Sequence, residues 1–315
     1  MPPPLDSIPK QASIVLAFAS VYFFWGSTYT AIRIGATEMP ALLLAGTRFL
    51  LAGSILLAWC AWRGLRIVWP RREMLVLSIV ALLLLGGGNV GLVYAEKTVP
   101  SGFASLALAV MPLYVALIEY LLPGGETLPW RGWLGILLGI LGLSALLWPS
   151  IRQGIHGNPA LLLALGALLG GNLSWAIGSI YSRRQKLAVN SFVAAAWQML
   201  IAGGICVLIG SALGQWTDFH LTARSVGSLA YLITGGSLLG YSGFVYLIEH
   251  VPVAKVSSYS YVNPMVAVLL GVVLLHERFE HSEFLGMALI VLAVFLLTTA
   301  RVNRKTQSLE EAKQL

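Results

Sequence analysis

Charged side chains are scarce in this chain. Asp, Glu, Lys and Arg make up only 10% of its 315 residues, whereas hydrophobic residues make up 57% and the mean hydropathy is +0.81. A soluble domain carries about 25% charged residues, so this chain has too few to cover itself for water. Apolar runs long enough to cross a bilayer recur along it. The composition therefore excludes an ordinary soluble protein.

Cysteine and catalytic motifs are scarce as well. Cys60 and Cys206 lie in or beside apolar runs without metal-ligand spacing, so we interpret them as packing residues rather than a disulfide or ligand pair. The sequence has no HExxH motif, P-loop or paired aspartates, and its five histidines lie in or near loops. Acid–base or metal catalysis needs such groups close together. We expect no enzyme, metal or cofactor; a membrane-embedded enzyme is a remote alternative.

Ten apolar segments are separated by polar, proline or glycine breaks. We predict an all-α polytopic membrane protein with ten transmembrane helices, because a helix satisfies its own backbone groups in lipid. The predicted spans are about 12–36, 40–62, 74–95, 100–122, 130–149, 160–181, 190–213, 227–248, 252–275 and 282–301. The first is long enough to span the bilayer, so we interpret it as an uncleaved helix rather than a signal peptide.

Basic residues give the chain a formal net charge of +7. Such a charge can indicate nucleic-acid binding, but in a membrane protein Lys and Arg set the topology. With the N-terminus inside, the inner segments hold 14 of these residues and the outer segments 5. We therefore predict that both termini are cytoplasmic and that nucleic acid is not a partner.

One phrase occurs twice in the sequence. VYAEKTVPSGFASLALAVMP (93–112) returns as VYLIEHVPVAKVSSYSYVNP (245–264). Further pairs keep an offset of 150 to 152 residues: Trp25 with Trp175, Arg33 with Arg183, Gly53 with Gly203, Gly91 with Gly243, Tyr94 with Tyr246, and Gly135 with Gly286. This constant register over five spans predicts a duplicated five-helix unit.

Five crossings are an odd number, so the second unit must enter the membrane from the opposite side. This predicts inverted repeats, the plan of many secondary transporters, with a substrate site near the midplane between the halves. We predict a first repeat at 1–150 (helices one to five), a second at 151–301 (helices six to ten) and a polar cytoplasmic tail at 302–315.

Four stretches carry a family resemblance: FFWGSTYTAIRIG (23–35), RFLLAG (48–53), the small-residue fourth span leading toward Glu126, and LLHERF (274–279). Through them the chain resembles the EamA-type branch of the drug/metabolite transporter superfamily over nearly its whole length. The resemblance implies ten helices, a pseudo-two-fold axis and a central cavity lined by spans one to four and six to nine. Spans five and ten would lie peripherally.

The resemblance also implies a function, since characterised relatives include bacterial exporters of amino acids and other metabolites. We expect a secondary transporter in the bacterial inner membrane, with lipid and a small-molecule substrate as partners, no obligate protein partner, and a monomeric state. The aromatic residues and few deep charges favour amino acids with aromatic or other apolar side chains. Multidrug or phosphorylated-metabolite transport is the alternative. Phosphate would favour several buried cations, and only Arg48 lies deep in a span.

Arg48 lies about eight residues into the second span, where an arginine costs a few kcal/mol or more unless it is paired or wetted. It could clamp a substrate carboxylate or act in a gate. Alternatively, it could bind helix-end carbonyls or Glu38 in a structural role. The aligned residue in the second half is Gln198, so the fold does not need the charge in both halves, which favours substrate binding.

The remaining candidate residues are aromatic or carry amide and hydroxyl groups. Trp25 and Trp175 lie away from the predicted interfaces, and Asn89 follows three glycines that permit close packing or exposed carbonyls. Interhelical packing and hydrogen bonding are the structural alternative for each. The expected substrate-binding residues are Tyr22, Trp25, Arg48, Asn89, Tyr94, Asn172, Trp175, Tyr241, Tyr246, Ser258, Tyr259 and Asn263.

Two prolines are expected hinges. Pro112 and Pro264 lie about 18 Å along their helices from Pro100 and Pro252, and each removes a backbone donor. We expect them to hinge an outer and an inner gate, the alternative being static kinks. Proton-driven pumps usually bury an acid or a histidine, and the sequence offers no clear midplane carboxylate. Exchange or uniport therefore stays open beside proton antiport.

Overall fold

The computed structural model describes residues 10–123, 129–155, 158–185, 187–251, 256, 259–277, 281, 283–293 and 295–296. Within these ranges the regular structure is helical throughout, without a strand. Eight helices there are long and apolar enough to cross a membrane, and two shorter apolar helices cover Val262–Leu275 and Glu283–Ala293. The prediction of an all-α polytopic membrane protein is confirmed; the shorter helices fall in the predicted ninth and tenth spans.

Four of the long spans consist of consecutive helical segments. The first is α1 (Lys10–Ser20), the π-helix η2 (Val21–Trp25) and α2 (Gly26–Ala36). The third is α4 (Arg71–Ala81), η3 (Leu82–Asn89) and α5 (Val90–Ala95), and the eighth is α11 (Ala223–Tyr231), η5 (Leu232–Tyr241) and α12 (Ser242–His250). The fourth is α6 (Ser101–Leu108) and α7 (Met111–Leu121). The other elements are α3 (Ala41–Trp62), α8 (Trp130–Ile155), α9 (Pro159–Gln185), α10 (Ser191–Ala212), the 3-10 helix η4 (Gln215–Asp218) and α14 (Tyr259–Leu275).

Helices α3 and α10 pack against each other through a reciprocal pair of glycine contacts. A Cβ added to Gly53 would lie 2.9 Å from the backbone nitrogen of Leu200, and one added to Gly203 would lie 2.7 Å from that of Leu50. Both positions need glycine because the two backbones approach this closely. The four residues are related by the 150-residue offset.

A second pair of matching contacts involves four other spans. One contact joins the third span to the sixth, and the other joins the eighth span to the first. A Cβ on Gly91 of α5 would lie 2.5 Å from the carbonyl oxygen of Ala167 in α9. A Cβ on the corresponding Gly243 of α12 would lie 3.3 Å from the carbonyl oxygen of Ala17 in α1. The chain thus uses the same close approach at positions about 150 residues apart.

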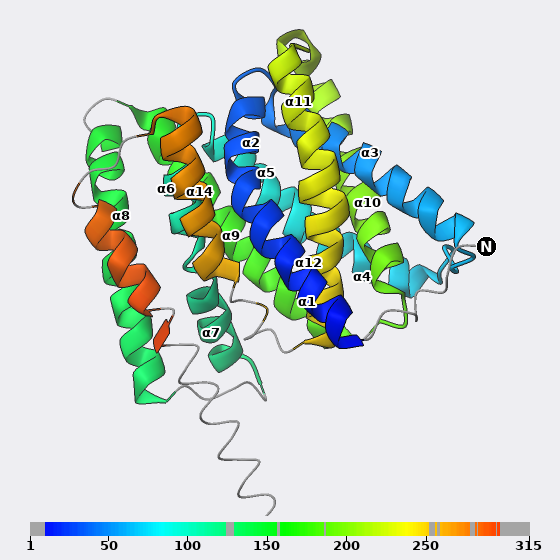
Figure 1. Cartoon of the computed structure of the whole chain (residues 1–315), viewed down its shortest axis with the longest axis horizontal. Helices are drawn as coiled ribbons and strands as arrows, with labels where there is room; N and C mark the ends of the chain where they lie inside the picture. The colour runs from blue at the N-terminus through cyan, green and yellow to red at the C-terminus, as the bar shows by residue number, and fades with distance from the viewer. Residues whose placement is uncertain are drawn as a thin grey trace, which may run out of the picture.

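The π-helical segments η3 and η5 begin at Leu82 and Leu232, again 150 residues apart, and both are rich in glycine. Their wide turns interrupt the regular α-helical ladder, a feature that is frequent at functional sites. In Figure 1, α8 and the helix at 283–293 run side by side at one edge of the molecule. Gly142 and Gly286 form their contact.

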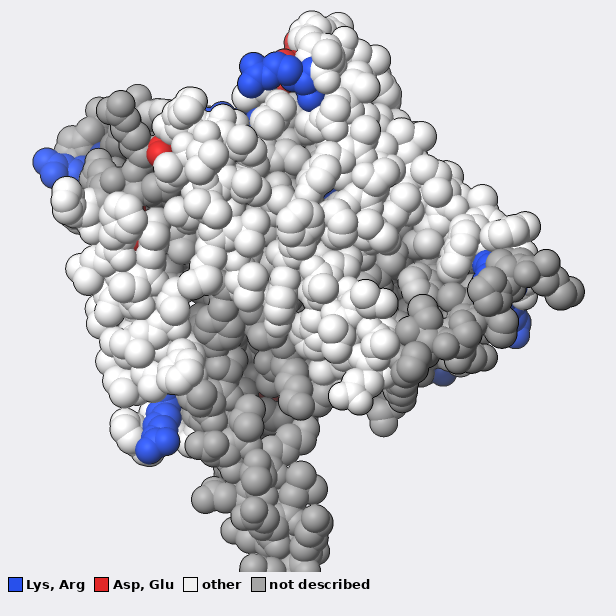
Figure 2. Space-filling view, viewed as in Figure 1, with Lys and Arg blue, Asp and Glu red and all other residues white. Residues whose placement is uncertain are grey.

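The surface between the two ends of the molecule is apolar. Figure 2 shows a broad face with almost no Lys, Arg, Asp or Glu, and charged residues gather at its margins. Large apolar side chains are exposed along the spans, including Leu208 at 71% and Met265 at 69%. Such exposure would be unfavourable in water and suits contact with lipid.

Candidate functional site

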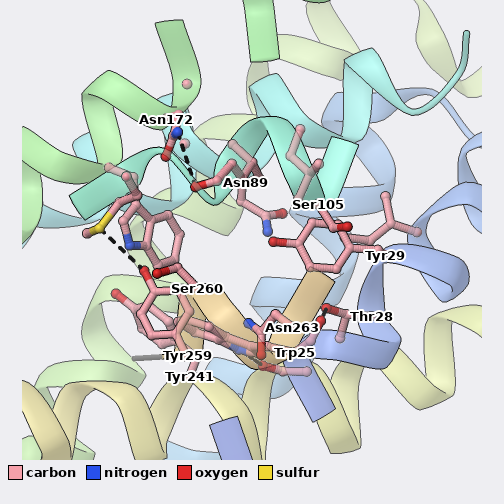
Figure 3. Close-up of a pocket in the computed structure, with 18 of the residues that line it drawn as sticks. Trp25, Thr28, Tyr29, Asn89, Ser105, Asn172, Tyr241, Tyr259, Ser260 and Asn263 are labelled. Atoms are coloured by element: carbon pink, nitrogen blue, oxygen red, sulfur yellow. Dashed lines mark hydrogen bonds between the residues drawn. The ribbon is translucent and has the colours of Figure 1, made fainter. Parts of the chain in front are cut away.

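A cavity lies in the interior, where spans from both halves of the sequence converge. Its walls come from α2, α3, the η3–α5 span and α6 of the first half, and from α9, η5 and α14 of the second. The space open to the centre of a water molecule is about 80 Å³. Figure 3 shows aromatic, amide and hydroxyl side chains arranged around it. This mixed lining is typical of a small-molecule site.

An aromatic cluster forms one wall of the cavity. The ring of Trp25 lies 5.5 Å from that of Trp175, 4.8 Å from Phe244 and 5.4 Å from Tyr259, measured between centroids. The Trp25 indole N–H donates to the carbonyl oxygen of Gly236 at 3.1 Å, which fixes its orientation. Edge-to-face contacts of this kind build a rigid apolar surface.

Arg48 reaches the cavity from α3 and is 4% exposed. Its Nε donates to the hydroxyl of Ser237 in η5 at 2.8 Å, and its guanidinium carbon lies 5.0 Å from the centroid of the Phe49 ring. Its Nη1 is buried and has no hydrogen-bond partner in the described part of the chain. Glu38, one of the structural partners considered for it, instead accepts from the hydroxyl of Thr222. One donor of a buried cation that lines the cavity is thus left without a protein partner.

Three further lining residues carry buried polar atoms without a hydrogen-bond partner among the described residues. They are Oδ1 of Asn89, Nε1 of Trp175, and both Oδ1 and Nδ2 of Asn263. Buried polar groups are normally paired, and an unpaired one costs roughly 1–3 kcal/mol. In Figure 3, Asn89 and Tyr29 point toward one another across the space, with Asn263 on the facing side. Donors and acceptors from both halves therefore converge on one cavity.

Several other polar residues that line the cavity have protein partners. Asn172 donates from its amide to the carbonyl oxygen of Leu108 at 3.4 Å. Tyr241 donates to Oε1 of Gln198 at 2.5 Å, and the hydroxyl of Tyr259 lies 3.7 Å from the sulfur of Met111. These contacts orient the rings and the amide, so the three side chains shape the cavity and offer a ligand little unused hydrogen-bonding capacity.

Three of the expected binding residues lie outside the lining. Tyr22 packs on Phe18, one turn before it, at a centroid distance of 5.7 Å. Tyr94 is 38% exposed, and Tyr246 stacks on His250 at 4.1 Å. Each lies on a helix that reaches the cavity or its aromatic wall but points away from it. Ser258 lies outside the described residues.

The two expected hinges have different surroundings. Pro112 is the second residue of α7, directly after the break at 109–110 that separates α6 from α7. Pro264 lies inside α14, which is assigned as a continuous helix through it, and lines the cavity. The fourth span is thus interrupted at its proline, whereas α14 is not.

The lining also includes residues that the sequence reasoning missed. Thr28 and Tyr29 follow Trp25 by three and four residues and share its helix face, which was the available signal. Ser105 lies among the small residues of the fourth span, and Ser260 lies in the Ser- and Tyr-rich stretch before Pro264. Serine residues are common in this sequence, so nothing in it distinguished Ser105 or Ser260 as a binding residue.

Two arginines 150 residues apart in the chain tie corresponding turns of the two repeats. Nη1 of Arg33 donates to the carbonyl oxygen of Val99 at 3.3 Å, and Nη1 of Arg183 donates to that of Val251 at 3.4 Å. Each arginine thus holds the turn before a proline, Pro100 in the first copy of the phrase and Pro252 in the second.

A carboxylate further ties the first of these turns. Oε1 of Glu277 accepts from the backbone N–H of Ser101 at 2.7 Å and from its hydroxyl at 2.8 Å, and Oε2 accepts from the N–H of Gly102 at 3.0 Å. Glu277 follows α14 and so caps the N-terminus of α6, where a negative charge is favoured. The contact joins the ninth and fourth spans.

The sequence profile of the EamA-like transporter family matches this chain twice, at residues 12–148 and 161–299. The chain belongs to the EamA-like transporter family. Its resemblance to the drug/metabolite transporter superfamily, inferred from four motifs, is confirmed.

Similar proteins include the uncharacterized inner membrane transporter YedA of Escherichia coli strain K12, 37% identical over 90% of each chain. The uncharacterized transporter YvbV of Bacillus subtilis is 26% identical over 97% of each chain. A crystal structure of a protein without a stated function superposes with a TM-score of 0.68 at 21% identity, over 93% of this chain and 99% of its own, which bears on the fold alone. Together these place the chain among multi-pass inner membrane transporters of small substrates.

Proposed function

We propose that this protein is a secondary exporter of amino acids with aromatic or other apolar side chains, working by alternating access through the central cavity. The observation that carries the proposal is the convergence of unpaired polar atoms of Arg48, Asn89, Trp175 and Asn263 on one cavity beside an aromatic wall. An amino acid offers a carboxylate, an ammonium group and an apolar side chain. Each of these finds a counterpart in the lining.

Arg48 would bind the substrate carboxylate. A guanidinium matches a carboxylate with paired N–H donors, and here the Nη1 donor is open while Nε is held by Ser237. The acceptor oxygens of Asn89 and Asn263 would take the ammonium group. The rings of Trp25, Trp175 and Tyr259 would contact the side chain and add cation–π attraction for the ammonium.

The transport cycle would use ten helices in two inverted repeats, with both termini in the cytoplasm. The reciprocal contacts of Gly53 with Leu200 and of Gly203 with Leu50 support a pseudo-two-fold axis between α3 and α10. The matching ties of Arg33 and Arg183 would then close opposite faces. Breaking one tie at a time would expose the cavity alternately, with Pro112 and Pro264 as hinges.

Efflux from cells tests the proposal. Cells expressing the protein, and matched cells carrying the empty vector, are loaded with dipeptides that contain each amino acid, and the release of the free amino acids is compared. We expect faster release of phenylalanine, tryptophan, tyrosine or aliphatic amino acids, and little change for acidic ones. If the two kinds of cells release each of the twenty amino acids at the same rate, the proposal is refuted, and drugs or phosphorylated metabolites become the substrates to test. The Arg48→Gln variant separates release through this cavity from a general effect of expression.

A further inference from the structure

Glu96 is a buried carboxylic acid that forms no ion pair within the described part of the chain. It follows α5 directly, one residue beyond the third span, and its relative exposure is 0%. Both of its carboxyl oxygens are buried and lack a hydrogen-bond partner in the described part of the chain. A charged carboxylate in that situation would cost far more than a neutral acid. The geometry therefore favours the protonated form of Glu96.

The cation beside Glu96 is Arg33, and it forms its hydrogen bonds with backbone carbonyl groups. Arg33 of α2 donates from Nη1 to the backbone carbonyl oxygens of Glu96 and Val99 rather than to the carboxyl group. Arg33 also lines a cavity of about 410 Å³ together with Arg224 and Glu277. Two residues that interact electrostatically with Glu96, Arg33 and Glu277, thus line a hollow near the buried acid.

The charged and titratable groups around Glu96 come from several elements. Arg33 and Tyr29 lie on α2, and Glu277 follows α14. Burial raises the pKa of Glu96 well above its ordinary value; Arg33 opposes the shift and Glu277 adds to it. The neighbouring Lys97 is exposed.

Two further helices pack against α5, and their basic residues lie elsewhere. On α3, Arg48 binds Ser237, and on α9, Arg183 and Arg184 lie in the last turn of the helix. Arg33 is therefore the cation that faces Glu96 among the groups named.

We propose that Glu96 is a proton-binding site that couples export to a proton gradient. This rests on the proposed function and adds a second ligand to it. With the proton bound, Arg33 is free to hold the carbonyl oxygens of the 96–99 turn, as it does here. When the proton leaves, the carboxylate competes for the same guanidinium, since a charge-assisted bond is stronger than one to a neutral carbonyl.

If Arg33 moved from these carbonyl oxygens to the Glu96 carboxylate, the turn before Pro100 would lose its hydrogen bonds to Arg33. The gate formed by this turn could then open. Tyr29 would connect this site to the substrate, because it is close enough to Glu96 to interact with it electrostatically and it also lines the central cavity. Proton and substrate would then act on the same gate from two sides. An exporter built in this way takes up a proton on one face and releases it on the other, in exchange for the substrate.

Proteoliposomes containing the purified protein test the proposal with labelled phenylalanine as the probe. Two reactions are compared: exchange of internal for external phenylalanine at equal pH, and net accumulation driven by a pH gradient. Three proteins are used: the wild type, Glu96→Gln, and Asp218→Asn as a matched control that removes an exposed acid. We expect all three to exchange, and only the wild type and Asp218→Asn to accumulate phenylalanine at least fivefold when the gradient is applied.

The assignment would be overturned if Glu96→Gln accumulated as much phenylalanine as the wild type. It would also be overturned if the wild type exchanged phenylalanine but did not accumulate it when the pH gradient was applied. An absence of wild-type exchange would instead count against phenylalanine as a substrate. In that case the infrared band of a protonated carboxyl group, followed through a pH titration, still tests the site. The band should titrate above the ordinary carboxyl range in the wild type and be missing in Glu96→Gln. Glu96→Asp, with a shifted midpoint, replaces the glutamine variant if that one does not fold.

Discussion

The indole rings of Trp25 and Trp175 meet edge to face with their centroids 5.5 Å apart, although 150 residues separate them in the chain. Phe244 contacts both rings, at 4.8 Å and 5.5 Å, and also lines a second hollow of about 500 Å³ beside Arg183 and Glu249. The aromatic cluster therefore lies between the central cavity and this hollow. It is placed to contact a substrate and to separate two spaces.

Truncation of Trp175 tests the role of this cluster. Trp175→Ala removes the apolar contact surface, and the loss of one large buried side chain corresponds to about 1.5–3 kcal/mol. We expect the KM for aromatic amino acids to rise about 10- to 100-fold in a transport assay, with Trp175→Phe retaining most of the affinity. Equal KM values for the alanine variant and the wild type would exclude contact with the substrate.

Replacement of Arg48 tests the carboxylate site. Arg48→Gln leaves an amide donor on a shorter side chain and removes the charge, and charge-assisted hydrogen bonds contribute about 1.5–3 kcal/mol. We expect normal expression and transport of phenylalanine weakened about 10- to 100-fold, while an analogue without a carboxylate is affected less. The discriminating measurement is the ratio of the two KM values. A ratio unchanged from the wild type would assign Arg48 a structural role.

A pair of glycine substitutions tests the close approach of α5 and α9. Gly91→Ala would place a Cβ 2.5 Å from the carbonyl oxygen of Ala167, and such overpacking costs about 1–3 kcal/mol. Gly166→Ala on α9 meets nothing within 4 Å and serves as the matched control. We expect a lower Tm in detergent for Gly91→Ala and an unchanged or higher Tm for Gly166→Ala. The reverse order would contradict the described packing.

The two arginine ties should control opposite gates. Arg33→Gln weakens the tie to Val99, and Arg183→Gln weakens the tie to Val251. With a cysteine introduced at Ser105 in the cavity wall, we expect an impermeant thiol reagent to label Arg33→Gln faster from the outer side and Arg183→Gln faster from the inner side. Labelling of both variants from the same side would contradict the gate assignment. The native Cys60 and Cys206 are buried and give the background.

The stability of the protein should depend on pH through Glu96. Because burial raises its folded-state pKa, both states hold the proton below the ordinary value of 4.5. As the pH rises from there toward the folded-state pKa, only the unfolded state gives up its proton, so folding is progressively disfavoured. We expect the Tm of the wild type to fall relative to that of Glu96→Gln over this range. Parallel curves would show that Glu96 is not perturbed.

The sequence predicted the helical fold and much of the cavity for one physical reason. Lipid requires long apolar runs with internally satisfied backbones, and it makes polar side chains such as Arg48, Asn89 and Asn263 conspicuous. The offsets that pair Gly53 with Gly203 also appear as contacts between α3 and α10. Polar residues within apolar spans, and glycines repeated at a constant offset, could therefore be identified from the sequence alone.

Other features could not be predicted because they depend on orientation around a helix that changes pitch. The π-helical turns of η3 and η5 shift every side chain that follows them, so Tyr94 and Tyr246 point away from the cavity. In the sequence, Glu96 lies one residue beyond the predicted third span, where a carboxylate gives no sign of burial. Its complete burial follows from the packing of Arg33 and Glu277 around that turn, which no local pattern records.

Counterflow in proteoliposomes measures the central claim most directly. Vesicles with purified protein are loaded with unlabelled phenylalanine, and the uptake of a trace of labelled phenylalanine is followed for the wild type and for Arg48→Gln. We predict rapid transient uptake by the wild type that is competed by other aromatic and aliphatic amino acids, and uptake at least about tenfold slower in the variant. Wild-type uptake equal to that of protein-free vesicles, for phenylalanine and every other apolar amino acid, would contradict the account.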